Sequence, residues 1–253
     1  MGTRLIAKDS DYEDDAVEYL APVRRGLEAI HLLNKSAAKA AKNYAPDKSN
    51  GVFVGSPLAA NEQFIRFKGQ SVFVQSEVRE ARAMTLFAVV RTLDALADDA
   101  TRPQYFGTYR SPPADGSGGT TYGVAMYNNT ATTLSAMAGR GNSLADHVSG
   151  SVNTSNPSQA TWSLMSLRVG VGVQEGTILK NETTGVEATL ATNLNLPRYP
   201  SLGKFRIGSG YTLQEGQCDM AYWQAHSVEL TPAEIAIVLA DIRAHMARRS
   251  ITV

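Results

Sequence analysis

A series of short β-rich runs, from about Gly51 to Val228, constrains the fold of this chain more than any other feature. The runs are separated by clusters of Gly, Pro, Asn and Ser, which are typical of turns. We predict strands at residues 51–54, 63–67, 71–75, 84–92, 104–109, 121–127, 132–138, 163–171, 177–181, 205–208 and 220–228. Many short strands without alternating helices predict an all-β sandwich rather than a parallel α/β sheet. A length of 253 residues is ordinary for one such domain.

Two polar stretches between the predicted strands have the composition of surface loops. Residues 110–120 are rich in Pro, Gly and Ser, and residues 139–157 are polar and poor in aromatic residues. Long loops on a rigid sandwich are where binding residues usually lie. We therefore expect any ligand site to be near one of these two loops.

The C-terminus predicts one amphipathic helix over residues 231–249. Thr231, Pro232 and Glu234 form a capping-box pattern, with Pro at the first helical position. One apolar stripe follows, formed by Ile235, Val238, Leu239, Ile242 and Met246. We expect this helix to close the sandwich by packing its stripe against a sheet.

Residues 1–42 differ in composition from the rest and are predicted to be helical. Val23, Leu27, Ile30 and Leu33 recur at helical spacing, and the Ala- and Lys-rich residues 36–42 could extend that helix. Residues 9–15 are strongly acidic. The segment is either an attachment or oligomerisation element or a helix packed on its own sandwich. This divides the chain into residues 1–42 and a sandwich over residues 43–253.

Charge and hydropathy exclude several classes of partner. The formal net charge is zero, so no overall basic field would attract nucleic acid. We expect no signal peptide, because the N-terminus lacks a basic region followed by an apolar run. No apolar stretch approaches the roughly 18–20 residues needed for membrane insertion. The single cysteine, Cys218, excludes an intramolecular disulfide.

Five segments, taken in order, resemble the concanavalin A-like (laminin G-like) lectin and glucanase sandwiches. They are residues 67–74, 84–92, 162–169, 205–209 and 219–235, and the match extends over roughly 44–251. The resemblance implies a two-sheet antiparallel jelly-roll sandwich with a C-terminal amphipathic helix. It also implies carbohydrate recognition in many members, and hydrolysis or a structural role in others, among which fold alone does not choose.

The polar N-terminal segment makes the chain most similar to tail-associated proteins of phages and prophages. That likeness implies a virion protein, made in the bacterial cytoplasm, whose residues 1–42 contact other virion proteins. It also implies a homo-oligomer, for which a trimer is plausible.

A glycan hydrolase of this fold would carry paired carboxylates on one strand, in a pattern close to E-x-D-x-E. The nearest acids are Glu215 and Asp219, which span a turn signal, and Glu77 and Glu80, which are out of phase for one strand face. The four histidines, His31, His147, His226 and His245, are scattered without metal-ligand spacing. We therefore predict no catalytic residue, no metal site and no enzyme.

No cofactor is predicted. The resemblance allows calcium, because many related sandwiches bind it through loop carboxylates. Asp94, Asp98 and Asp99 cluster after one strand, and Asp115 and Asp146 lie in other loops. Solvated loop acids explain this pattern better than a calcium site does.

A glycan platform needs exposed aromatic rings beside polar groups, because a ring can stack on the C–H face of a sugar. Six residues around the 110–120 loop have this character: Tyr105, Tyr109, Tyr122, Tyr127, Asn128 and Asn129. We predict a non-enzymatic module that binds a bacterial surface glycan or receptor. The alternatives are a purely structural virion component that uses the sandwich for protein contacts, and a glycan hydrolase.

Overall fold

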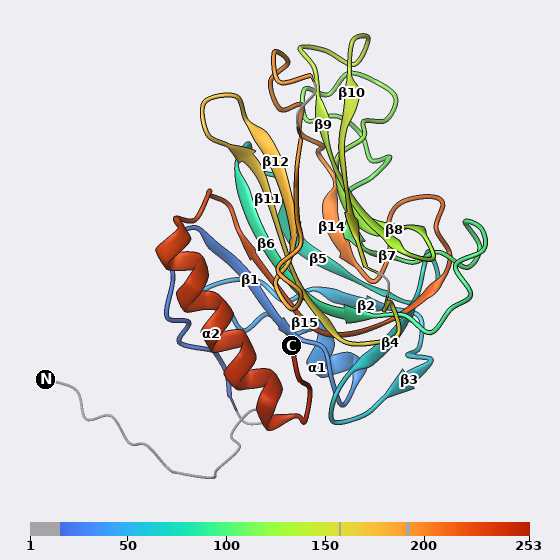
Figure 1. Cartoon of the computed structure of the whole chain (residues 1–253), viewed down its shortest axis with the longest axis vertical. Coiled ribbons are helices and arrows are strands. Elements are labelled where there is room, and N and C mark those ends of the chain that lie inside the picture. The colour runs from blue at the N-terminus through green and yellow to red at the C-terminus, as the bar shows by residue number, and fades with distance from the viewer. Residues whose placement is uncertain (1–15, 157, 191–192) are drawn as a thin grey trace, which may run out of the picture.

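Two antiparallel sheets form a sandwich in the computed structural model, which describes residues 16–156, 158–190 and 193–253 (Figure 1). The eight-stranded sheet contains, in spatial order, β13 (Glu187–Thr189), β12 (Gly176–Asn181), β11 (Ser163–Val171), β6 (Met84–Arg91), β15 (Gln217–His226), β4 (Ile65–Lys68) and β3 (Ala59–Ala60), and β1 (Leu27–Leu32) pairs with β15 beside β4. The seven-stranded sheet contains β10 (Val148–Ser155), β9 (Thr133–Arg140), β8 (Val124–Thr130), β7 (Gln104–Gly107), β14 (Lys204–Ile207), β5 (Phe73–Arg79) and β2 (Val52–Val54).

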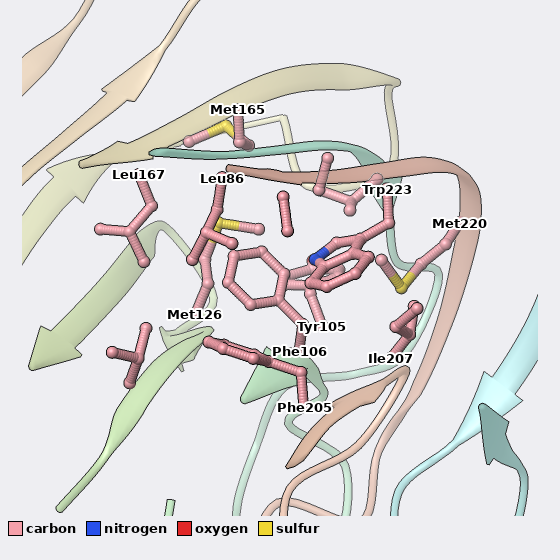
Figure 2. Close-up of a cluster of buried hydrophobic side chains, with 14 of the residues drawn as sticks. Leu86, Tyr105, Phe106, Met126, Met165, Leu167, Phe205, Ile207, Met220 and Trp223 are labelled. Atoms are coloured by element: carbon pink, nitrogen blue, oxygen red, sulfur yellow. The ribbon is translucent and has the colours of Figure 1, made fainter. Parts of the chain in front are cut away.

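The main hydrophobic core lies between the two sheets. Trp223 is fully buried at its centre, with ring centroids 6.2 Å from Phe106 and 5.8 Å from Phe205 (Figure 2). Leu86 and Leu167 face the same interior from neighbouring strands. Each fully buried large apolar side chain contributes about 1.5–3 kcal/mol, so this layer of contacts drives the sheets together.

A second core lies outside the eight-stranded sheet, under helix α2 (Pro232–Arg248) (Figure 1). The helix begins as predicted, because the Thr231 side chain accepts from the Glu234 backbone and the Glu234 side chain accepts from the Thr231 backbone. Its buried side chains include the whole predicted stripe: Ile235, Val238, Leu239, Ile242 and Met246. The sheet is therefore covered on both faces, which explains why β6 is almost entirely buried.

The prediction of a helix from Val23 to Leu33 is wrong. Leu27–Leu32 forms β1, which pairs with β15 and contributes Leu27, Ile30 and Leu32 to the second core. Pairing with a sheet edge satisfies the backbone of this segment, and this tertiary contact outweighs the local helical spacing. Within residues 16–42, helix is present only in the short α1 (Ala37–Ala41). Residues 1–15 lie outside the described residues.

The prediction of one long loop over 139–157 is also wrong. Val148–Ser155 forms β10, which pairs with β9 in unbroken register from Val148 opposite Arg140 to Ser155 opposite Thr133. The strand is polar because it lies at the edge of the sheet and buries only every second residue, so its apolar signal is weak. The short strands β3 and β13 were also not predicted. The other predicted strands lie where the sequence indicates.

Candidate functional site

Three loops meet at one end of the seven-stranded sheet, toward the top of Figure 1. Residues 108–123 join β7 to β8, residues 141–147 join β9 to β10, and residues 193–203 lead into β14. Backbone bonds link the loops, since Ala114 donates to Pro200 and Gly141 donates to Pro197. The antiparallel order of the strands thus collects segments far apart in the sequence into one surface.

Tyr109 and Tyr122 come together because the base of the 108–123 loop continues the ladder between β7 and β8. Arg110 N–H donates to Thr121 O at 3.0 Å, which places the tyrosines on facing segments. Their ring centroids are 6.4 Å apart with the planes inclined by 32°, and both side chains are half-buried. Part of each tyrosine therefore remains in contact with solvent.

His147 extends this pair into a row of rings. Its ring centroid lies 4.8 Å from that of Tyr122 and 6.1 Å from that of Tyr199. The Nδ1 atom of His147 lies 2.6 Å from the Leu144 carbonyl, so Nδ1 carries the proton that it donates there and fixes the ring. We call Tyr109, Tyr122 and His147 the aromatic platform.

Polar groups border the aromatic platform. Asp115 accepts from the Tyr199 hydroxyl at 2.5 Å and from the Ser117 hydroxyl at 2.6 Å. These bonds, with the Ser117 bond the stronger cause, hold the pKa of Asp115 below its usual value. Bonds from Asn142 and Ser143 likewise lower the pKa of Asp146. Both acids are thus ionised acceptors at neutral pH.

A buried ion pair supports the platform from beneath. Arg198 donates to Glu80 at 2.9 Å, and both side chains are fully buried. Glu80 also accepts from the backbone N–H of Val124 and from the Thr108 hydroxyl, while Arg198 donates to the Gly139 carbonyl. One pair therefore joins the ends of all three loops, and a ligand would meet a surface that needs little ordering.

The six predicted site residues separate into different environments. Tyr109 and Tyr122 lie in the aromatic platform. Tyr105 and Asn128 are buried and bond to each other at 2.6 Å, so neither is part of an exposed surface. Half-buried Tyr127 lies on β8, opposite Gln104 of β7. Exposed Asn129 lies next to the β8–β9 turn, at the other end of that strand.

Four residues of this surface were absent from the predicted site: Arg110, Asp115, His147 and Tyr199. Arg110 and Asp115 lie inside the loop that was singled out, so proximity to Tyr109 could have indicated them. His147 and Tyr199 enter from two other loops. Only the order of the strands in the sheet brings them close, and single-sequence patterns do not reveal that order.

Three of the acids considered for hydrolysis, Asp219, Glu77 and Glu80, take part in ion pairs. Asp219 is buried between Arg66 and Arg91, at 2.6 and 3.0 Å, and lines a hollow of about 130 Å³ with Asp94. Glu77 pairs with Lys204 at the surface. Asp94 accepts from the backbone N–H of Gln217. Within the described ranges, no three His, Cys, Asp or Glu side chains lie close enough to hold a metal ion.

The described part of the chain contains no helix that is long and apolar enough to cross a membrane.

No protein-family model and no curated protein matches the chain, but solved structures do. The binding domain of botulinum neurotoxin DC in complex with SialylT gives a TM-score of 0.58 at 9% identity, covering 86% of this chain and 52% of that one. The receptor-binding domain of the mosaic serotype C/D gives 0.59 at 10%, covering 87% and 52%. The serotype D ligand-binding domain in complex with N-acetylneuraminic acid gives 0.55 at 10%, covering 85% and 51%.

The chain thus spans about half the length of these structures, all of which are named as binding domains rather than catalytic ones. At this level of identity the likeness concerns architecture, and it agrees with the two-sheet topology described above. The chain has a two-sheet β-sandwich fold, similar to part of these receptor-binding domains.

Proposed function

We propose that this chain is a non-catalytic recognition module that binds a glycan through the aromatic platform. The observation that carries the proposal is the convergence of Tyr109, Tyr122 and His147, from two adjacent loops, with neighbouring ring centroids 6.4 and 4.8 Å apart. Half-buried rings can stack on the C–H face of a sugar while the surrounding polar groups bind its hydroxyls. Asp115 and Asp146 supply acceptors beside the rings.

The fold comparison supports a binding role. Two of the similar structures are named as complexes with SialylT or N-acetylneuraminic acid, so this sandwich occurs in proteins that engage sugars. Because the chain spans only about half of those structures, the argument for a sugar site rests on its own residues.

The wider setting belongs to the same proposal. The ligand would be a bacterial surface glycan or receptor, and the chain would be a phage tail-type virion protein, oligomeric and attached through its N-terminal segment. Since β1 belongs to the eight-stranded sheet, removing residues 1–42 would damage the fold. A truncation of residues 1–15 tests attachment instead, by particle incorporation and light scattering. Unchanged particle incorporation and an unchanged oligomeric state would contradict an attachment role for residues 1–15.

The test of glycan binding is a screen of the purified chain against bacterial surface polysaccharides and defined oligosaccharides. Release of reducing ends is measured in the same wells. We expect binding without release. Release would contradict the non-catalytic proposal and point to a hydrolase, whereas no binding would contradict glycan recognition and leave a structural role.

A further inference from the structure

Arg110 lies at the edge of the aromatic platform with most of its guanidinium group available. Its Nε donates to the Tyr109 hydroxyl at 3.2 Å, and its Cζ lies 5.4 Å from the Tyr109 ring centroid and 6.0 Å from that of Tyr122. The side chain is exposed. Among the described residues, no carboxylate lies within ion-pair distance of it, and its two terminal amino groups have no hydrogen-bond partner.

Two other arginines at this end of the sheet, Arg140 and Arg198, differ from Arg110. Arg140 donates to the carbonyls of Asn193, Gln174 and Glu175. Arg198 is fully buried against Glu80. Their guanidinium groups are used to hold the loops together, so they have little capacity left for a ligand.

The Asp115 and Asp146 carboxylates accept from neutral donors around them and form no ion pair with Arg110. The Asp115 carboxylate accepts from the Ser117 backbone and hydroxyl and from the Tyr199 hydroxyl. The Asp146 carboxylate accepts from the backbone and side chains of Asn142 and Ser143. The positive charge beside the rings is therefore available to a ligand.

The backbone fixes the position of Arg110. Its φ of 63° lies in the left-handed region, and its N–H donates to Thr121 O at the base of the loop. The two tyrosine rings then support the guanidinium group by cation–π contact. A guanidinium group held in this way loses little conformational freedom when a ligand binds.

We infer that Arg110 makes the aromatic platform selective for sugars that carry a carboxylate group. The inference rests on the proposed function, because the sugar ring must stack beside the guanidinium. The planar guanidinium presents parallel N–H donors that match the two oxygens of a carboxylate, whereas a neutral hydroxyl offers one weaker acceptor. We expect one such charged contact to raise affinity about 10- to 100-fold.

The test uses a panel of acidic oligosaccharides, each offered as the free carboxylate and as its methyl ester, which keeps the shape and removes the charge. Wild-type protein should bind the acid about 10- to 100-fold more tightly than the ester. Arg110→Gln should reduce the affinity for the acid to that for the ester and leave the affinity for the ester unchanged. Arg110→Lys, which keeps the charge without the planar donor pair, should restore part of the preference.

Two controls separate selectivity from general effects. Arg248→Gln, an exposed arginine on α2, should leave both affinities unchanged. Tyr122→Ala should weaken the acid and the ester alike, because it removes the stacking surface. Thermal unfolding of each variant checks that it is folded.

The outcomes distinguish this inference from the proposed function. Equal binding of acid and ester by the wild type, or an unchanged ratio in Arg110→Gln, would overturn the selectivity and leave glycan binding intact. Tighter binding of sulfated or phosphorylated analogues than of carboxylates would overturn the assignment of the anion. If no member of the panel binds in either form, the proposed function and the inference both fail.

Discussion

Glu80 and Arg198 form an ion pair with an N–O distance of 2.9 Å, although 118 residues separate them and both side chains are fully buried. Glu80 follows directly after β5, and Arg198 lies in the segment before β14. Through Val124 and Gly139 the pair contacts the beginning of β8 and the end of β9. It therefore links the framework of the sandwich to the three loops at this end, two of which carry the aromatic platform.

Replacement of one partner would leave the other charge buried and unpaired. We predict that Glu80→Gln lowers the free energy of unfolding by about 3–5 kcal/mol. Urea denaturation of variant and wild type measures the difference.

Glu77→Gln is the matched control for this prediction. Glu77 pairs with Lys204 at 2.5 Å, but both side chains are about one-third exposed. This change should cost less than about 1 kcal/mol. Equal effects of the two substitutions would contradict a supporting role for the buried pair.

β1 should contribute to stability as a core strand. Ile30 is fully buried in the second core, whereas Ile237 on α2 is 49% exposed. We predict that Ile30→Ala lowers the free energy of unfolding by about 2–5 kcal/mol, because it opens a cavity in the core. Ile237→Ala, the same chemical change at the surface, should have a much smaller effect. A small effect at both positions would show that β1 is not packed as described.

Stability should fall in mild acid because of His31. Burial lowers the pKa of His31 from 6.5 to about 4, although its bond with the Ala40 carbonyl opposes this. The unfolded chain therefore binds a proton at His31 near pH 6.5, whereas the folded chain binds it only when the pH approaches 4. The contribution of neutral His31 to the free energy of unfolding is therefore complete above pH 6.5. It decreases by up to about 3 kcal/mol as the pH falls toward 4.

The pH prediction is tested by denaturant unfolding of wild type and His31→Gln between pH 7.5 and 4. The variant should show a shallower loss of stability over this range. Some loss should persist, because burial also lowers the pKa of His226. Identical pH profiles would exclude His31 as a cause.

The elements that could be predicted from the sequence carry their own local signals. The β11 strand, Ser163–Val171, alternates between faces, and the helix after Thr231 has both a cap and an apolar stripe. The wrong predictions fall where tertiary contacts, rather than local sequence patterns, determine the secondary structure. Leu27–Leu32 has helical spacing but pairs with β15, and Val148–Ser155 lacks an apolar signal because it is an edge strand.

The candidate site shows the same division. The composition of the 110–120 loop indicated the region, and Tyr109 and Tyr122 lie together there. Tyr105 is close in sequence but faces the core. His147 joins the platform from a loop 25 residues after Tyr122, through the adjacency of β8, β9 and β10. Chain neighbours can be read from a sequence, but spatial neighbours across a sheet require its strand order.

The most direct test of glycan recognition is a titration of the tightest-binding glycan against wild type, Tyr109→Ala/Tyr122→Ala and Tyr211→Ala. Tyr211 is also half-buried and carries an arginine over its ring, with Arg206 Cζ at 4.0 Å, but it follows β14 in the chain and its hydroxyl donates to the Lys204 carbonyl of that strand. We predict that the double variant loses at least about tenfold in affinity while remaining folded, and that Tyr211→Ala binds like wild type. Wild-type affinity in the folded double variant would contradict the central claim that the aromatic platform is the binding site.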